Sequence, residues 1–212
     1  MSKLENILSF VRLAGRLKDT PRSAYTALGK QESTAEHSWR LALLAMTLKP
    51  KYPNLDFGRV LELCIVHDLG EALHGDIPAV DQDPTRPKST AERDDLITML
   101  ASLAEADRLR FLDAWEDYEN GVSPESRLVK ALDKLETIFQ HNEGCNPPDF
   151  DYAFNLDYGR KQTDFDDVTR TLRELAEDML SMGCTTVVNM DGGGSSTLAL
   201  RMPGKEGFTI LN

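Results

Sequence analysis

The sequence has little of what disulfide-linked or membrane-inserted proteins need. Its 212 residues include only three cysteines, Cys64, Cys145 and Cys184, which are widely spaced and form no paired ligand motif. The N-terminus lacks an apolar signal stretch behind basic residues, and no apolar run approaches the length that spans a bilayer. We therefore expect a cytoplasmic protein with neither a disulfide framework nor a membrane partner.

Positive charge is also scarce. The chain has 24 Lys and Arg against 35 Asp and Glu, which gives a formal net charge of −11. This balance repels polyanions, and the chain lacks the excess of positive charge that binding a nucleic acid polymer requires. A small phosphorylated ligand is still compatible with it, because a bound cation can reverse the local field. We expect a small-molecule partner.

Helical periodicity is present over most of the chain. Apolar residues recur at helical spacing in segments that Pro-, Gly- and Asp-rich stretches separate. Ser33 and Glu36 have the form of a capping box, Asp56 is a plausible N-cap, and Pro124 suits a first helical turn. Irregular segments are predicted through roughly Glu32, over Asp81 to Ser89, and around Cys145 to Asp151. The pattern predicts an all-α bundle over residues 1–181.

Residues 182–212 have a different character. Cys184 to Asn189 is β-branched, Thr197 to Met202 alternates, and three consecutive glycines at 192–194 form a turn signal between them. This pattern predicts a short β appendage resembling a hairpin, and a domain boundary between residues 181 and 182.

Four residues on three predicted helices offer a set of metal ligands. His67 and Asp68 lie in an apolar helical context, His37 lies on an earlier helix, and Asp133 interrupts the apolar stripe of a later one. Two imidazoles and two carboxylates suit Mn²⁺, Co²⁺, Fe²⁺ or Zn²⁺. Taken singly, each could equally be an ordinary polar residue, so the prediction depends on their combination.

Several motifs occur together in one order along the chain. They are Glu36-His37-Ser38 after a helix cap, His67-Asp68-Leu69-Gly70-Glu71, Gly75-Asp76-Ile77, Trp115-Glu116-Asp117-Tyr118-Glu119, and Lys130-Ala131-Leu132-Asp133-Lys134-Leu135-Glu136. Together they resemble the HD-domain hydrolases, and most closely the 5′-deoxynucleotidase-like group. The resemblance covers about residues 4–180. It implies an HD-domain helical bundle that binds one divalent metal through His37, His67, Asp68 and Asp133, and that commonly forms homodimers.

Two further carboxylates are candidates for catalysis. Glu71 lies one helical turn beyond His67, where it could exchange a proton with water or with the leaving alkoxide. The resemblance also implies a catalytic role for Glu71, and a role for Asp76 in binding the sugar or positioning water. The alternatives are an exposed helix glutamate and a turn-forming aspartate.

The segment before the capping box contains candidate substrate contacts. Arg22 resembles the substrate-binding arginine of the family, and a guanidinium can bind phosphate in a bidentate manner. Tyr25 stands where relatives have Trp, and Ser23 follows the arginine directly, where other branches have Trp. A solvated loop arginine is the alternative interpretation of Arg22.

The glycine-rich tail resembles a second family. The stretch Asn189-Met190-Asp191-Gly192-Gly193-Gly194-Ser195-Ser196-Thr197 is similar to a signature of phosphodiester glycosidases, over about residues 182–212 only. Those enzymes need a complete mixed α/β domain, so we interpret the tail as a fused fragment. A flexible turn would explain the same glycines.

The sequence thus predicts a metal-dependent phosphomonoesterase acting on nucleoside 5′-monophosphates, with 2′-deoxynucleotides as the favoured class. Another small phosphomonoester is the nearest alternative substrate. A non-catalytic module that senses metal or nucleotide is the alternative of a different class, and the retention of Glu71 beside four ligands argues against it.

Overall fold

Helices make up most of the structure, and short strands lie between the first two α-helices and after the last one. The computed structural model describes residues 2–76, 88–181, 186–191, 196–201 and 209–211. The helices are α1 (Lys3–Ala14), η1 (Gly15–Lys18), α2 (Thr34–Leu48), η2 (Lys49–Lys51), α3 (Phe57–Val66), α4 (Glu71–His74), α5 (Lys88–Leu100), α6 (Glu105–Asn120), α7 (Pro124–Glu143), α8 (Phe154–Asp157), α9 (Arg160–Thr163) and α10 (Asp167–Ser181). The strands are β1 (Pro21–Tyr25), β2 (Gln31–Ser33), β3 (Thr186–Asp191), β4 (Ser196–Arg201) and β5 (Thr209–Leu211).

Three helices begin at the residues that carry start signals. Helix α2 opens with the capping box, in which Ser33 and Glu36 each accept the other's main-chain N–H. Asp56 caps α3 with its carboxylate, and Pro124 lies in the first turn of α7. Local sequence therefore fixes where the helices carrying the candidate site begin.

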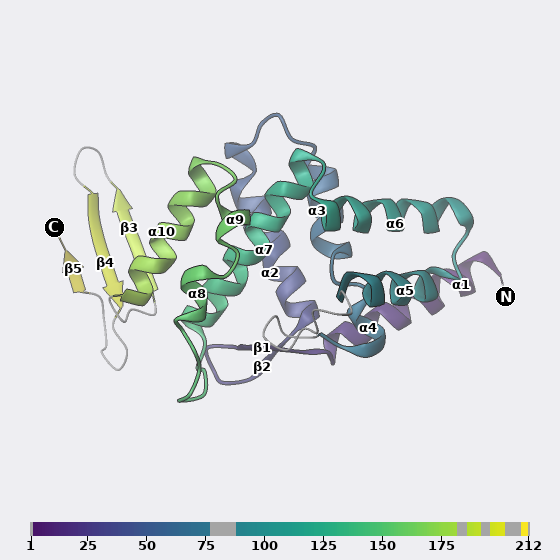
Figure 1. Cartoon of the computed structure of the whole chain (residues 1–212), viewed down its shortest axis with the longest axis horizontal. Helices are drawn as coiled ribbons and strands as arrows, with labels where there is room; N and C mark the ends of the chain where they lie inside the picture. Colours follow the sequence, from purple (N-terminus) through teal and green to yellow (C-terminus); the bar gives the residue numbers. More distant parts are fainter. Residues whose placement is uncertain (1, 77–87, 182–185, 192–195, 202–208, 212) are drawn as a thin grey trace.

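Helix α7 runs through the middle of the helical part and supplies much of its core. Helices α2, α3, α9 and α10 and strand β1 pack against it (Figure 1). Its apolar stripe is fully buried and consists of Leu128, Val129, Leu132 and Leu135. Asp133 is also buried on this helix, so an acidic side chain lies inside the core.

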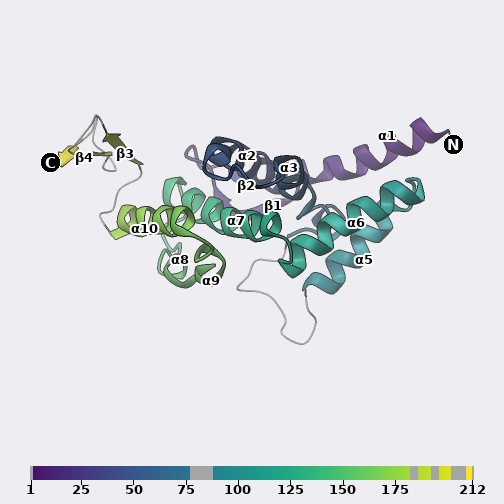
Figure 2. The ribbon, with the colours of Figure 1, turned by 90° about the horizontal axis from the view of Figure 1, so that it is seen from above.

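The two ends of the molecule are built differently. Helices α5 and α6 pair near α1 at the N-terminal end, and the strands β3 to β5 lie beyond α10 at the other end (Figure 2). None of the helices in the described ranges is long and apolar enough to cross a membrane.

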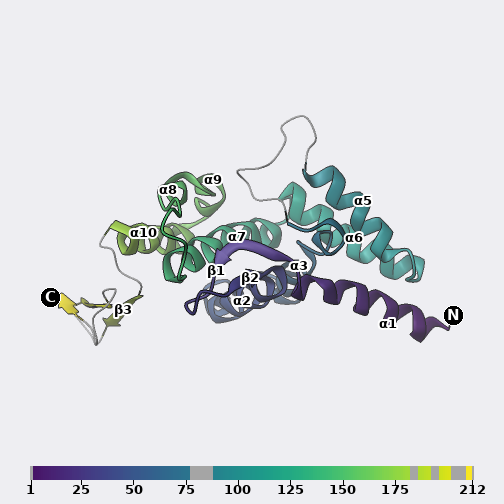
Figure 3. The ribbon, with the colours of Figure 1, turned by 90° about the horizontal axis from the view of Figure 1, so that it is seen from below.

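The segment before α2 is more ordered than predicted. It was expected as an irregular loop, but β1 and β2 form an antiparallel pair in which Pro21 faces Ser33 and Tyr25 faces Gln31. This hairpin lies against α7 and next to α2 (Figure 3). Strand-strand pairing satisfies backbone groups that a buried loop would leave unpaired.

Two other helix boundaries differ from the prediction. The i, i+3/i+4 spacing of Val60, Cys64, His67 and Glu71 predicts one helical track, but α3 ends at Val66 and tight turns precede α4. Helix α7 continues through His141 to Glu143, although Asn142, Gly144 and Pro147 in the sequence favour a loop around His141. Of the segment predicted as an irregular loop between Asp81 and Ser89, residues 81–87 lie outside the described residues.

The C-terminal strands form one antiparallel sheet in the order β3-β4-β5. Asp191 pairs with Ser196 and Leu198 with Leu211, so each strand pairs with the next one along the chain. The predicted all-α bundle with a β appendage is confirmed, and the appendage has a third strand that the prediction missed. The glycine turn at 192–194 lies outside the described residues.

Candidate metal centre

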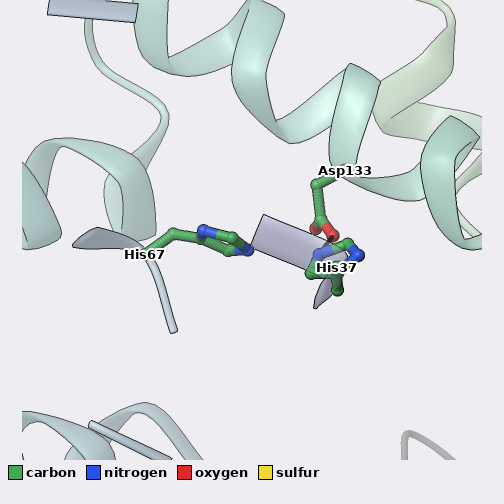
Figure 4. A group of neighbouring side chains, drawn as sticks. All are labelled: His37, His67 and Asp133. Atoms are coloured by element: carbon green, nitrogen blue, oxygen red, sulfur yellow. Dashed lines mark ion pairs between the residues drawn. The ribbon is translucent and has the colours of Figure 1, made fainter. Parts of the chain in front are cut away.

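The structure brings three of the predicted ligands together in the core. Ligand atoms of His37 from α2, His67 directly after α3, and Asp133 from α7 all lie within 4.8 Å of one another (Figure 4). His37 Nε2 is 3.2 Å from Asp133 Oδ1. All three side chains are buried, so water competes little with a ligand at this point.

Asp68, the fourth predicted ligand, lies at the edge of this group. Its Oδ2 atom is 3.1 Å from His67 Nε2 and 3.9 Å from His37 Nε2. Its side chain is 17% exposed, whereas that of His37 is 0% exposed. Asp68 is therefore the predicted ligand whose side chain is most exposed to solvent.

The donor atoms of this cluster fit a divalent cation. The Nε2 atoms of His37 and His67 are buried and make no hydrogen bond. Their other ring nitrogens are engaged, since His67 Nδ1 is 3.0 Å from the Cys64 carbonyl and His37 Nδ1 contacts the Glu136 carboxylate. A hydrogen bond at one ring nitrogen directs the other toward a metal, as at many histidine metal sites.

The carboxylates keep their negative charge. Burial alone would raise the pKa of Asp68, but His67, Arg22 and His37 hold that pKa well below its usual range. Burial opposes ionisation of Asp133 as well, and Lys134 and His37 hold its pKa low. A cation entering the cluster would therefore meet two ionised carboxylates.

Asp133 is held from the side away from His37. Tyr118 donates a 2.7 Å hydrogen bond from its hydroxyl to Asp133 Oδ2, and Lys134 Nζ lies 2.9 Å from the same oxygen. Since both contacts use Oδ2, the atom that faces His37 is Oδ1. These contacts orient the carboxylate within the core.

Glu71 is buried beside the cluster. It is 2% exposed, and Thr34 donates a 3.0 Å hydrogen bond to its Oε2 atom. Because a turn separates Asp68 from α4, the position of Glu71 comes from packing, and the predicted continuous helix does not exist. Gly70 allows that packing, since a Cβ there would lie 2.6 Å from the Glu92 carbonyl oxygen.

A cleft adjoins Glu71 on the side of η1. Its volume is about 300 Å³. One wall comes from the segment before and at the start of β1, and the other comes from α4. The lining residues are Arg16, Asp19, Thr20, Pro21, Glu71, Ala72, Leu73, His74 and Gly75. Glu71, three residues after Asp68, therefore borders a space that a small molecule can enter.

Arg22 reaches the cluster from β1. Its Nη1 atom is 3.4 Å from Asp68 Oδ2, its Nη2 atom donates a 3.2 Å hydrogen bond to Thr137, and its Nε atom is 3.5 Å from Glu32 Oε2. Burial alone would lower the pKa of Arg22, but Asp68 and Asp76 raise it. Asp76 thus acts on Arg22 electrostatically, and the guanidinium stays charged.

Tyr25 is tied to α7 through its backbone. Its carbonyl oxygen accepts a 2.6 Å hydrogen bond from Gln140 Nε2. Tyr25 follows Arg22 by three residues, and in a regular strand two such side chains point to opposite faces. The β1–β2 register is irregular between Pro21 and Tyr25, so this rule does not fix the direction of the Tyr25 side chain. A substrate contact by the Tyr25 side chain stays a prediction.

Sequence reasoning assigned no individual role to two buried glutamates and a threonine at this site. Glu136 contacts His37, Glu32 contacts Arg22, and Thr34 contacts Glu71. A partial signal exists for Glu136, which lies one helical turn after Asp133 inside the quoted motif. Glu32 and Thr34 look like ordinary polar residues until the hairpin and α2 are placed in space.

A helical bundle with a buried His, His-Asp and Asp cluster defines a class of protein. The chain belongs to the HD domain family, whose model matches residues 14–173. A phosphodiester glycosidase family model matches residues 159–211, which include the glycine-rich tail.

Individual relatives sharpen this assignment. The chain is 35% identical to 5′-deoxynucleotidase HDDC2 of Danio rerio over 142 residues, which is 66% of this chain and 70% of that protein. It is 36% identical to 5′-deoxynucleotidase HDDC2 of Homo sapiens over 140 residues, 65% of this chain and 68% of that protein.

Solved structures show the same fold. A predicted metal-dependent phosphohydrolase from Magnetospirillum magnetotacticum MS-1 matches with a TM-score of 0.70 at 24% identity, over 85% of this chain and 92% of that one. A conserved hypothetical protein from Pyrococcus furiosus matches with a TM-score of 0.55 at 30% identity, over 82% of this chain and 99% of that one.

Proposed function

We propose that this protein is a metal-dependent phosphomonoesterase that hydrolyses nucleoside 5′-monophosphates, preferably 2′-deoxynucleotides, to nucleoside and phosphate. The observation that carries the proposal is the cluster of His37, His67 and Asp133, with two buried Nε2 atoms that lack hydrogen bonds. The 5′-deoxynucleotidase name of the relatives supports the substrate class.

The proposed ligands of the metal are His37, His67, Asp68 and Asp133. One divalent transition metal, Mn²⁺, Co²⁺, Fe²⁺ or Zn²⁺, suits their mixed nitrogen and oxygen donors. When bound, such a metal supplies Lewis-acid polarisation of the phosphoryl group. Every other task in the reaction falls to side chains of the chain itself.

Glu71 is the proposed general acid-base group. Its buried carboxylate is oriented by Thr34, and it borders the cleft in which a substrate could lie. It would accept the proton of the attacking water and return one to the leaving 5′ oxygen of the nucleoside. Phosphate transfer then needs no covalent nucleophile from the protein.

Three residues are proposed to bind the substrate. Arg22 would bind the phosphate, since its charged guanidinium lies beside Asp68 at the accessible edge of the cluster. Asp76, which acts on Arg22 electrostatically, would bind the sugar or position water. Tyr25 is proposed to contact the nucleoside.

We propose a cytoplasmic homodimer in which apolar helix faces meet. Helix α1 leaves one such face exposed, formed at helical spacing by Leu4, Ile7, Leu8 and Val11. The net charge of −11 favours a small-molecule substrate over a nucleic acid polymer. Size-exclusion chromatography with light scattering tests the dimer, and a monomer at micromolar concentration contradicts it.

We further propose that residues 1–181 carry this activity and that residues 182–212 are a fused fragment without chemistry of their own. The strands of that segment pair in sequence order into one small sheet. A sheet of this size cannot enclose a substrate by itself.

Phosphate release from a panel of deoxy- and ribonucleoside 5′-monophosphates tests the function. Mn²⁺, Co²⁺, Fe²⁺ and Zn²⁺ are supplied separately, and chelator treatment and Asp68→Ala should each abolish release. Asp94→Ala, an exposed aspartate on α5, is the matched control and should retain full activity. Silence across the panel with metal bound contradicts the function and favours the non-catalytic sensing module.

A further inference from the structure

Two buried glutamates outside the proposed ligand set lie next to His37. Glu136 on α7 is 1% exposed and Glu32 on β2 is 3% exposed. Buried carboxylates are rare unless charged or hydrogen-bonding groups compensate them. Each of these two has such a compensating partner, and each partner belongs to the proposed site.

Glu136 holds His37. One carboxylate oxygen, Oε2, contacts His37 Nδ1, while Arg40 Nη1 lies 3.5 Å from the other oxygen. Glu136 follows Asp133 by one helical turn, so α7 contacts both sides of a single imidazole ring. The ring of His37 is fixed between two carboxylates of the same helix.

Glu32 holds Arg22. Pro21 pairs with Ser33 across the hairpin, so Arg22 and Glu32 are the next residues along the two antiparallel strands. Glu32 Oε2 is 3.5 Å from Arg22 Nε, and Thr137 and Asp68 contact the two terminal nitrogens. The guanidinium therefore makes two hydrogen bonds through its terminal nitrogens, and its Nε atom faces the Glu32 carboxylate in an ion pair without a hydrogen bond.

The same residues could be mistaken for a second cation site. Ligand atoms of Glu32, His37 and Glu136 lie within 4.8 Å of one another. However, the two carboxylates already face the guanidinium groups of Arg22 and Arg40, and His37 Nδ1 contacts Glu136. Two positive charges already occupy the surroundings that a second cation would need.

We propose that Glu136 and Glu32 are positioning residues with separable effects, Glu136 on the metal through His37 and Glu32 on the substrate phosphate through Arg22. A carboxylate on the outer nitrogen of a ligating imidazole fixes its orientation and raises its basicity. A guanidinium with a fixed fork loses less freedom when it binds an anion. The role of Glu32 rests on the proposed phosphate contact of Arg22.

The first test measures metal affinity of the full chain by competition with a chromophoric chelator. Glu136→Gln should weaken Mn²⁺ or Zn²⁺ binding by about tenfold and Glu136→Leu by up to about 100-fold, the range seen when such partners are lost. Glu32→Gln should leave metal affinity within twofold of the parent protein. Glu143→Gln, on the same helix and also paired with Arg40, is the matched control and should change nothing.

The second test measures binding of inorganic phosphate to the metal-loaded protein by calorimetry. Glu32→Gln should weaken it by about tenfold, because it removes the carboxylate charge that faces the Arg22 guanidinium at 3.5 Å. Glu136→Gln, once saturated with metal, should bind phosphate nearly as the parent protein does. Circular dichroism of each metal-free variant checks the fold, and the glutamine variants carry the test if Glu136→Leu does not fold.

Three outcomes overturn the proposal: unchanged metal affinity in Glu136→Gln, unchanged phosphate affinity in Glu32→Gln, or a second bound metal that Glu32→Gln removes. These readouts do not need turnover. If metal and phosphate binding respond as expected but no nucleoside monophosphate is hydrolysed, the proposed function fails while the positioning roles stand.

Discussion

The contacts within the helical part and those within the C-terminal sheet differ in how far apart in the sequence the paired residues lie. In the helical part, His37 contacts Glu136 across 99 positions of sequence, and Arg22 contacts Thr137 across 115. In the sheet, Asp191 pairs with Ser196, and every strand pairs with its sequence neighbour. Long-range contacts order a site within narrow limits, whereas a local hairpin orders mainly its own backbone.

This difference indicates which changes the molecule can tolerate. Residues that meet in the core from α2, α3 and α7 depend on one another, so a change in one of them affects the whole cluster. None of the cluster residues lies in the sheet, so a change in the sheet should affect the cluster little. The four changes below test this contrast in order of decreasing expected effect.

Removing the charge of one proposed ligand should have the largest effect. Asp133→Asn keeps the shape of the side chain but removes a negative charge that faces His37, so metal affinity and turnover should fall by about 10³-fold or more. Chelator competition and phosphate release measure the two quantities. Asp167→Asn, whose side chain is 96% exposed, is the control, and an Asp133→Asn variant with full metal affinity would remove Asp133 from the ligand set.

Glu71→Gln should lower turnover without affecting the fold or the metal affinity. The amide can still accept the hydrogen bond of Thr34, so fold and metal affinity should persist, while kcat falls by about 10² to 10⁴ with the loss of the proton carrier. Steady-state kinetics on the best substrate of the panel measure this. A kcat within tenfold of the parent value would exclude Glu71 as the acid-base group.

Gly70→Ala should perturb the cluster through packing. The added methyl group would lie 2.6 Å from the Glu92 carbonyl oxygen, so α4 or α5 must move, at a cost of about 1 to 3 kcal/mol in the free energy of unfolding. Urea denaturation measures the cost. Gly15→Ala is the control, because nothing lies within 4 Å of its added Cβ and its φ of −59° suits alanine. Equal stability of the two variants would contradict the close packing of Gly70.

Truncation after Ser181 should have the smallest effect. The helical part should melt cooperatively, bind metal and turn over substrate within about twofold of the full chain, because the sheet contributes no proposed ligand or catalytic group. Thermal melting, metal titration and kinetics on both forms measure this. Loss of cooperative melting or of metal binding would show that the helical part depends on the sheet.

The parts of the fold that sequence predicted are those set by local chemistry. Ser33 and Glu36 satisfy each other within one helical turn, and Asp56 and Pro124 act on their own helix ends, so no distant residue decides these features. The proposed ligands stood out because an acidic residue such as Asp133 interrupts an apolar stripe. The structure brings these side chains together, as the family resemblance implies.

The parts that sequence missed depend on residues far apart. Glu32 and Glu136 look like solvated glutamates, and only the packing of the hairpin against α7 shows that both are buried. Periodicity alone favoured one continuous helix over α3 and α4. The break lies near Gly70, which approaches the backbone of α5 closely, and the sequence pattern does not show this contact. The burial of His141 likewise depends on a partner outside α7, the side chain of Asn155.

Helix α7 contacts both nitrogens of the His37 ring, through Asp133 and Glu136, and these contacts affect native-state fluctuations. Sliding α2 along α7 by one residue, about 1.5 Å, would break the contacts to Asp133 and Glu136 together. Opening of either helix therefore disrupts the same imidazole. In hydrogen exchange, the central amides of α2 and α7 should behave as one foldon, with a common opening free energy that rises when metal binds.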